Sequence, residues 1–158
     1  MTTASTASAC ATTTTPATPP AVDSTKALAR AFIERFDAND IPGAVALLSD
    51  DVRYWLAGKP AELPGIGLHD KAQIAKVFGR MDRRLEGGLR MKVLSIIAEG
   101  DTAAMEVQSH GLLKNGRHYD NEYHFRMRVR DGLICEVREY YDSLHVHTVW
   151  YLPEPAAA

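Results

Sequence analysis

This 158-residue chain has little cysteine, no long apolar run and no large excess of charge of either sign. Its two cysteines, Cys10 and Cys135, are too few for a disulfide framework or a thiolate zinc site. No apolar run approaches the roughly 20 residues that a membrane span needs. The 18 basic and 20 acidic residues leave a net charge of −2, which gives no basic footprint for nucleic acid or membrane. We therefore expect a cytoplasmic globular protein with neither partner.

Composition also indicates how the chain is divided. Apolar residues make up 46% of it, enough for the core of one domain. Residues 1–22 are rich in Thr, Ala and Pro and carry no charged side chain. Such a segment buries too little apolar surface to offset the entropy lost on ordering. We predict a disordered tail over 1–22, one domain over 23–152 and a short second tail over 153–158.

Three helices are expected in the first half of the domain. Ser24 is placed to cap the first, which has apolar residues at spacings of three and four. Pro42 suits the first turn of a short second helix, and Asp70 suits the cap of a third. Gly87-Gly88 is expected to close that third helix. A strand over 52–56 and a Gly- and Pro-rich loop over 57–68 separate the second helix from the third.

The second half alternates between apolar and polar residues and is predicted to be strand. The breaks are Gly100-Asp101, Asn115-Gly116 and Asp131-Gly132, and the last two are strong hairpin signals. The expected strands are 89–99, 102–114, 117–130 and 133–148. The fold class is therefore α+β. Strands of this length bend or curl, and helices across the open side would enclose a cavity.

The register of the first long hairpin decides which side chains face that cavity. A two-residue turn at Asn115-Gly116 pairs Lys114 with Arg117. The expected cross-strand pairs are then His110 with Asn121, Gln108 with Tyr123, and Glu106 with Phe125.

The second hairpin permits two registers. A two-residue turn at Asp131-Gly132 sets Arg138 opposite Phe125, which buries a charge. A three-residue turn with Gly132 in the left-handed conformation instead sets Val137 opposite Phe125 and Glu139 opposite Tyr123. We choose the second register because it keeps the apolar residues on one face.

One face of the sheet is then apolar but carries a group of polar side chains. They are Glu106, Gln108, His110, Asn121, Tyr123 and Glu139. A buried carboxylate costs several kcal/mol unless it is paired or protonated, so Glu139 is the foremost candidate for a functional acid. The alternative is a structural Glu139 bonded to Tyr123. Tyr54 and Trp55 are expected to pack in the core or to line the pocket. His145-x-His147 has no third ligand nearby in sequence, so we expect no metal.

Two stretches resemble a known family. They are "ALLSDDVRYW" and "GRHYDNEYHFRMRVRDGLICEVREYYD", and over about residues 24–150 the chain resembles the SnoaL-like branch of the nuclear transport factor 2-like superfamily. The resemblance implies a cone-shaped, strongly curved mixed sheet, three N-terminal helices closing a deep pocket, and a homodimer. Its relatives include polyketide cyclases, ketosteroid isomerases, limonene epoxide hydrolases, dehydratases and proteins without catalysis.

The residues that such relatives use narrow the choice. At the acid–base positions of ketosteroid isomerases this chain has Phe32, Leu56 and Tyr123, which argues against that chemistry. At the catalytic positions of the limonene epoxide hydrolases this chain has Glu106, Gln108 and Glu139. The carboxylate at the last position is kept as Glu139, but the residue that would help it to activate water is replaced by Gln108. SnoaL-type cyclases use one pocket carboxylate with no metal or cofactor, and Glu139 fits that requirement.

We therefore predict a cofactor-independent acid–base enzyme, a cyclase, isomerase or lyase, for a hydrophobic small molecule bearing a carbonyl or hydroxyl. Glu139 would move the proton, while Tyr123, Gln108 and Asn121 would hold the oxygen. Further binding residues are expected to be Tyr54, Trp55, Glu106, His110, Asn121, Phe125 and Val137. The alternative is a non-catalytic binding or assembly protein of the same fold, and epoxide hydrolysis is the third interpretation.

Overall fold

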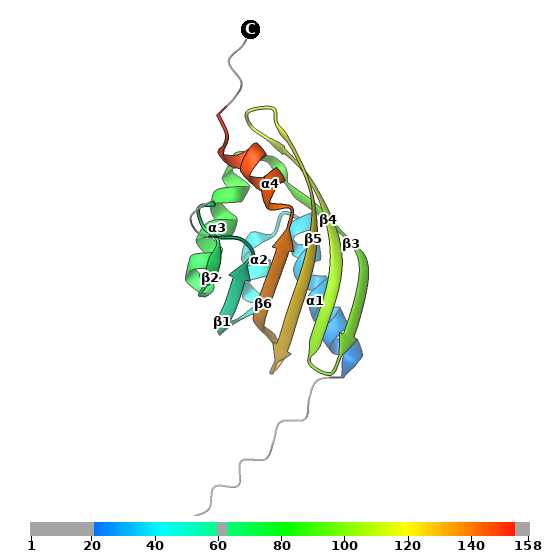
Figure 1. The fold of residues 1–158 in the computed structure, drawn as a ribbon. Helices are drawn as coiled ribbons and strands as arrows, with labels where there is room; N and C mark the ends of the chain where they lie inside the picture. Colours follow the sequence, from blue (N-terminus) through cyan, green and yellow to red (C-terminus); the bar gives the residue numbers. More distant parts are fainter. Residues whose placement is uncertain (1–20, 60–62, 154–158) are drawn as a thin grey trace, which may run out of the picture.

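A curved, six-stranded mixed sheet with helices against its inner face makes up the computed structural model, which describes residues 21–59 and 63–153 (Figure 1). The predictions for the two tails therefore fall mostly outside the described residues. In chain order the elements are α1 (Val22–Asp37), α2 (Ile41–Ala46), β1 (Leu48–Leu56), β2 (Gly67–His69), α3 (Lys71–Arg84), β3 (Leu85–Glu99), β4 (Thr102–Leu113), β5 (His118–Arg130), β6 (Leu133–Tyr141), α4 (Ser143–Val146) and η1 (His147–Tyr151). The α+β class is confirmed.

The sheet is open. Its strand order is β2-β1-β6-β5-β4-β3, with β1 and β6 parallel and every other pair antiparallel. The expected curvature is present, but β2 and β3 remain separate edges, so a closed cone-shaped barrel would be the wrong description. Strand β2 begins at Gly67, inside the segment predicted as a loop over 57–68, and ends one residue beyond it.

Helix caps follow local chemistry at two of the three predicted starts. Asp40 caps α2 and accepts a hydrogen bond from the Gly43 amide at 2.9 Å. Asp70 caps α3 through a reciprocal capping box with Gln73, as its position predicts. Ser24 is not a cap, because α1 begins at Val22 and the Ser24 hydroxyl donates to a carbonyl one turn back.

Several element boundaries differ from the sequence prediction, including the ends of α3 and β6. Helix α3 ends at Arg84, and Gly87-Gly88 lies inside β3, where both residues have positive φ. Strand β6 ends at Tyr141 instead of continuing to 148. Asp142 then caps α4 by accepting from the His145 amide at 3.0 Å.

The β4–β5 turn has three residues, not the predicted two. The Leu113 amide donates to the Arg117 carbonyl at 2.8 Å, and Gly116 has a φ of +84°. The register is thereby moved by one residue, and a one-residue shift turns each side chain to the opposite face.

The predicted cross-strand pairs of β4 are therefore wrong. His110 pairs with Asp120, Gln108 with Glu122, and Glu106 with His124. The side chains of Glu106, Gln108 and His110 lie exposed on the outer face.

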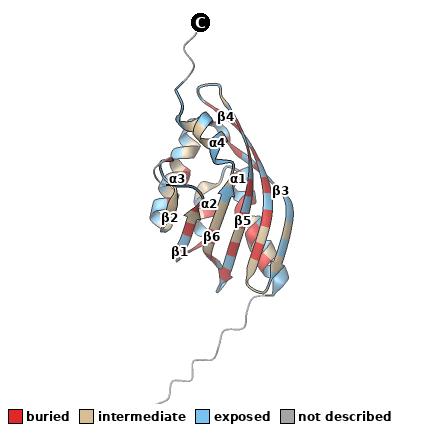
Figure 2. Ribbon diagram, viewed as in Figure 1, coloured by how far each residue is buried: buried red, intermediate tan, exposed pale blue. Residues whose placement is uncertain are grey.

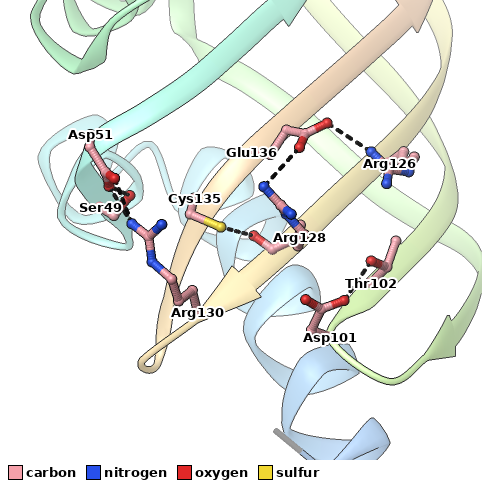
Figure 3. Close-up of polar contacts among 9 residues, drawn as sticks. All are labelled: Ser49, Asp51, Asp101, Thr102, Arg126, Arg128, Arg130, Cys135 and Glu136. Atoms are coloured by element: carbon pink, nitrogen blue, oxygen red, sulfur yellow. Dashed lines mark hydrogen bonds and ion pairs between the residues drawn. The ribbon is translucent and has the colours of Figure 1, made fainter. Parts of the chain in front are cut away.

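The β5–β6 hairpin begins with a two-residue turn and then shifts register at a bulge. Asp131 and Gly132 have positive φ and form the two-residue turn, which is not the register chosen from the sequence. Cys135 is then an extra residue in β6, a bulge whose thiol donates to the Arg128 carbonyl at 3.5 Å (Figure 3).

That bulge restores the inward direction of the apolar residues. Glu139 pairs with Phe125 and Val137 with Met127, so the predicted pairing of Glu139 with Tyr123 is wrong by two positions. A shift of two keeps each side chain on its own face, and Val137 is fully buried.

The core fills the space between the inner face of the sheet and helices α1 and α3. The buried residues alternate along the strands in Figure 2. Aromatic side chains of the two helices and β1 meet there: Phe78 lies 4.9 Å from Phe36 and 5.5 Å from Tyr54 between ring centroids. This packing fixes Tyr54, which is 1% exposed, beneath the pocket described below.

The outer face of the sheet is charged. Glu136 accepts from Arg126 at 2.8 Å and lies 3.2 Å from Arg128 (Figure 3). Exposed pairs of this kind contribute about 0–1 kcal/mol each.

Candidate functional site

A cavity of about 610 Å³ lies between the inner face of the sheet, α3 and the C-terminal α4–η1 segment. Its size is typical of small-molecule pockets. The apolar walls include Leu56, Ile66, Val77, Phe78, Met81 and Val146. Aromatic side chains that carry a hydroxyl or an indole N–H also line it: Tyr119, Tyr123, Tyr141, Trp150 and Tyr151.

Glu139 is the one carboxylate among the described residues that line this cavity. The Tyr54 hydroxyl donates to its Oε2 at 2.5 Å. Burial raises the pKa of Glu139 to about 7, and the hydrogen bond from Tyr54 lowers it by less. The residue keeps partial exposure because it borders the cavity, but the walls around its carboxyl group are largely apolar. Glu139 is therefore placed to accept and to return a proton near neutral pH.

Three residues of β5 form a second polar group, of which Tyr119 and Tyr123 line the cavity. The Tyr119 and Tyr123 hydroxyls are 2.7 Å apart, and the Asn121 amide nitrogen donates to Tyr119 at 2.9 Å. The side-chain oxygen of Asn121 accepts from the Asp142 amide at 3.1 Å, which fixes the direction of its NH₂ group. Burial raises the pKa of Tyr119 to about 12 and that of Tyr123 well above its ordinary value. Both hydroxyls thus remain protonated donors at neutral pH.

The predicted site residues divide between the two faces. Glu139 and Tyr123 line the cavity, and Tyr54 reaches Glu139 from below. Asn121 stands behind the tyrosines, and Phe125 and Val137 are buried on the same inner face.

The other four predicted site residues lie outside the cavity. Glu106 accepts a hydrogen bond from Ser95 at 2.9 Å, and His110 pairs with Asp120 on the outer face. Gln108 is exposed there too. Trp55 also points outward, with the Arg138 guanidinium 4.1 Å from its ring centroid. The register shift of β4 explains the first three, and alternation along β1 separates Trp55 from Tyr54.

Sequence reasoning missed the C-terminal wall of the pocket. Trp150 and Tyr151 belong to η1, which lies beyond the last predicted strand and partly within it. The signal that could have found the helix is Asp142 three residues before His145, a helix-capping spacing. Tyr119 and Tyr141 share the inward alternation of Tyr123 and Glu139, so they could also have been assigned to the site.

Comparison with known proteins places the fold in a family. The sequence model of one protein family, the SnoaL-like domain, matches residues 29–137 of this chain. The chain belongs to the SnoaL-like family. A search of the curated proteins found no match to it.

Solved structures agree with the family assignment. An NTF2-like protein of unknown function from Burkholderia pseudomallei has a TM-score of 0.69 and 18% identity, over 82% of this chain and 98% of its own. A putative polyketide cyclase from Xanthomonas campestris pv. campestris has a TM-score of 0.64 and 24% identity, over 80% and 96%. An epoxide hydrolase of M. tuberculosis, described as LEH-like, has a TM-score of 0.67 and 21% identity, over 82% and 90%.

These likenesses define the fold of the SnoaL-like chain and leave its reaction to be argued from its own residues. Within residues 21–59 and 63–153, no helix combines the length and the apolar character that crossing a membrane requires.

Proposed function

We propose that this SnoaL-like protein is a cofactor-independent acid–base enzyme, a cyclase, isomerase or lyase. Its substrate would be a hydrophobic small molecule that bears a carbonyl or hydroxyl. The observation that carries the proposal is a single carboxyl group, with a pKa near 7, in a cavity lined by tyrosines. A group with such a pKa is populated as both base and acid at neutral pH, which is the best condition for moving protons.

The proposed first step is removal of a proton from a carbon next to the substrate carbonyl. The Glu139 carboxylate takes that proton and becomes a carboxylic acid. The electron pair of the C–H bond forms a C=C bond, and the π pair of the C=O bond moves onto the oxygen, which gives an enolate. Tyr54 holds Oε2, which leaves Oε1 for the substrate. Return of the proton to another carbon completes an isomerisation, and loss of a leaving group completes an elimination.

The Asn121–Tyr119–Tyr123 chain would stabilise the negative oxygen. In the proposed arrangement Asn121 donates to Tyr119, Tyr119 donates to Tyr123, and Tyr123 directs its own proton into the cavity. The donors are fixed before the reaction begins, so they need no reorganisation as charge develops.

We also propose a homodimer and a cytoplasmic location. A cluster on the outer face, formed by the half-buried Trp55 and Arg138 and the exposed Tyr140, supports the dimer. A stacked arginine with two aromatic rings is a composition that protein interfaces favour.

A non-catalytic binding protein is the second candidate, and one contact favours it. If the Tyr54–Glu139 hydrogen bond serves only to satisfy a buried carboxyl, the pocket would hold its ligand without turnover. Epoxide hydrolysis has less support, because Glu106 and Gln108, which stand at the matching positions of the epoxide hydrolases, lie on the outer face.

Hydrogen–deuterium exchange at a carbon acid tests the proposal without the natural substrate. The probe is 2-tetralone in D₂O, and exchange of its acidic CH₂ protons is followed by proton NMR. We expect the wild type to accelerate the exchange and Glu139→Gln to lose about 10²–10⁴-fold of that acceleration. Glu106→Gln is the matched control, since it removes an exposed carboxylate. Acceleration that survives Glu139→Gln would exclude the mechanism, and binding without acceleration would favour the second candidate.

A further inference from the structure

We propose that the ligand of this pocket carries a carboxylate at its solvent-facing end, and that Arg80 and Arg83 recognise that carboxylate. The inference rests on the proposed function only in taking this cavity as the substrate site. It adds a substrate class: an apolar body with a carbonyl or hydroxyl at one end and an acid group at the other.

The arginines belong to the pocket through the geometry of α3. Val77, Arg80, Met81 and Arg84 are spaced by three and four residues, so they share one face of the helix, and all four line the cavity. A stripe of this kind ordinarily carries apolar residues alone. Arg83, one position before Arg84, also lines the cavity.

The three arginines differ in the groups that their guanidiniums already contact. The Arg84 Nη2 donates to the Trp150 carbonyl at 2.9 Å, and its guanidinium lies 5.0 Å from the Trp150 ring centroid. Arg84 therefore holds the η1 wall in place. Arg80 and Arg83 are exposed, and no carboxylate of the described residues lies within 4.0 Å of either.

Three arginines of the sheet, unlike Arg80 and Arg83, have acidic partners. Arg126, Arg128 and Arg130 on β5 each lie within ion-pair distance of an Asp or Glu. Arg80 and Arg83 on α3 instead present two permanent positive charges at the edge of an apolar cavity. A guanidinium matches the planar shape of a carboxylate and binds it through two parallel hydrogen bonds.

Charge then sets the direction in which the ligand enters. Glu139, bonded to the buried Tyr54, repels an anion when it is ionised, whereas the exposed Arg80 and Arg83 attract one at the solvent side of the cavity. The apolar body of the ligand would lie between them, against Phe78 and Met81. The carbonyl or hydroxyl is thereby presented to Glu139 and the tyrosines.

Calorimetric binding of two matched compounds tests the inference independently of turnover. The probes are 1-naphthaleneacetic acid and its uncharged amide, at low salt and pH 8. We expect the acid to bind the wild type about two- to thirtyfold more tightly than the amide, the range for two exposed charge pairs. The double variant Arg80→Gln/Arg83→Gln should lower the affinity for the acid to that for the amide and leave the amide unchanged. Lys76→Gln, on the exposed side of the same helix, should change neither.

The outcomes separate the two proposals. Equal binding of acid and amide to the wild type, or a preference for the acid that survives the double variant, overturns the carboxylate inference alone. If neither compound binds at millimolar concentration, the carboxylate inference is overturned and the assignment of this cavity as the substrate site fails with it.

Discussion

Replacing Glu139 by Gln should stabilise the protein at alkaline pH and not at acidic pH. Burial moves the pKa of this carboxyl from 4.5 to about 7 on folding. At 1.36 kcal/mol for each tenfold change in proton affinity, the shift corresponds to about 3 kcal/mol. Because the folded pKa lies above the unfolded pKa, the folded state binds the proton more tightly. The free energy of unfolding therefore falls as the pH rises from about 4.5 through 7.

Glu139→Gln removes this loss of stability at high pH but keeps the hydrogen bond with Tyr54. The glutamine introduced by Glu139→Gln has nearly the same size as the glutamate, and its carbonyl oxygen can still accept from Tyr54. The expected free energies of unfolding of variant and wild type are similar at pH 4. At pH 8 the variant should be more stable by up to about 3 kcal/mol.

Urea unfolding followed by tryptophan fluorescence measures both values. Glu106→Gln serves as the control for loss of one negative charge, because Glu106 lies exposed on the outer face. A difference between variant and wild type that changes by less than about 1 kcal/mol between pH 4 and pH 8, or that changes with the opposite sign, would show that folding does not raise the pKa of Glu139 as described.

Three other predictions concern the pocket, a turn and the outer face. Tyr54→Phe removes the hydrogen bond that lowers the pKa of Glu139, so the pH at which the 2-tetralone exchange reaches half its maximum should rise; an unchanged profile would contradict this. Gly116→Ala places a side chain at a φ of +84° with no steric clash, and should reduce the free energy of unfolding by about 1 kcal/mol in the same urea assay. Sedimentation at micromolar concentration should show a dimer that Arg138→Glu weakens, whereas a strict monomer would exclude the proposed interface.

Local chemistry in the sequence was enough to predict most elements. The cap at Asp70 and the early Pro42 are properties of a few neighbouring residues, and both starts are confirmed. The hairpin turns were placed correctly for the same reason. Turn length was not predictable in this way, since a glycine with positive φ suits both a two-residue and a three-residue loop.

The candidate site depended on that turn length. The extra loop residue before β5 moved Glu106, Gln108 and His110 to the outer face. Glu139 stayed inside because the bulge at Cys135 compensates for the two-residue turn beside it. A bulge is a compromise between turn geometry and burial along the whole strand, so no short window of residues indicates it.

The C-terminal wall illustrates a contact that only the fold reveals. The Arg117 guanidinium donates to the carbonyls of Thr148, Val149 and Leu152 at 3.2, 3.1 and 2.7 Å. These bonds satisfy carbonyls at the end of η1, a terminus that otherwise lacks partners. Because Arg117 is about 30 positions away in the sequence, periodicity within 133–148 could not show that the segment turns into a helix.

The titration of Glu139 itself shows whether this carboxyl group can act as both acid and base near neutral pH. Carbon-13 NMR of protein labelled at the glutamate side-chain carboxyls, with Glu139→Gln used to assign the resonance, gives the pKa of this one group. A carboxyl that exchanges protons with a substrate in this pocket should titrate with a midpoint near 7. A midpoint near the ordinary value of 4.5 would show a carboxylate that is ionised throughout the neutral range, and would contradict the account.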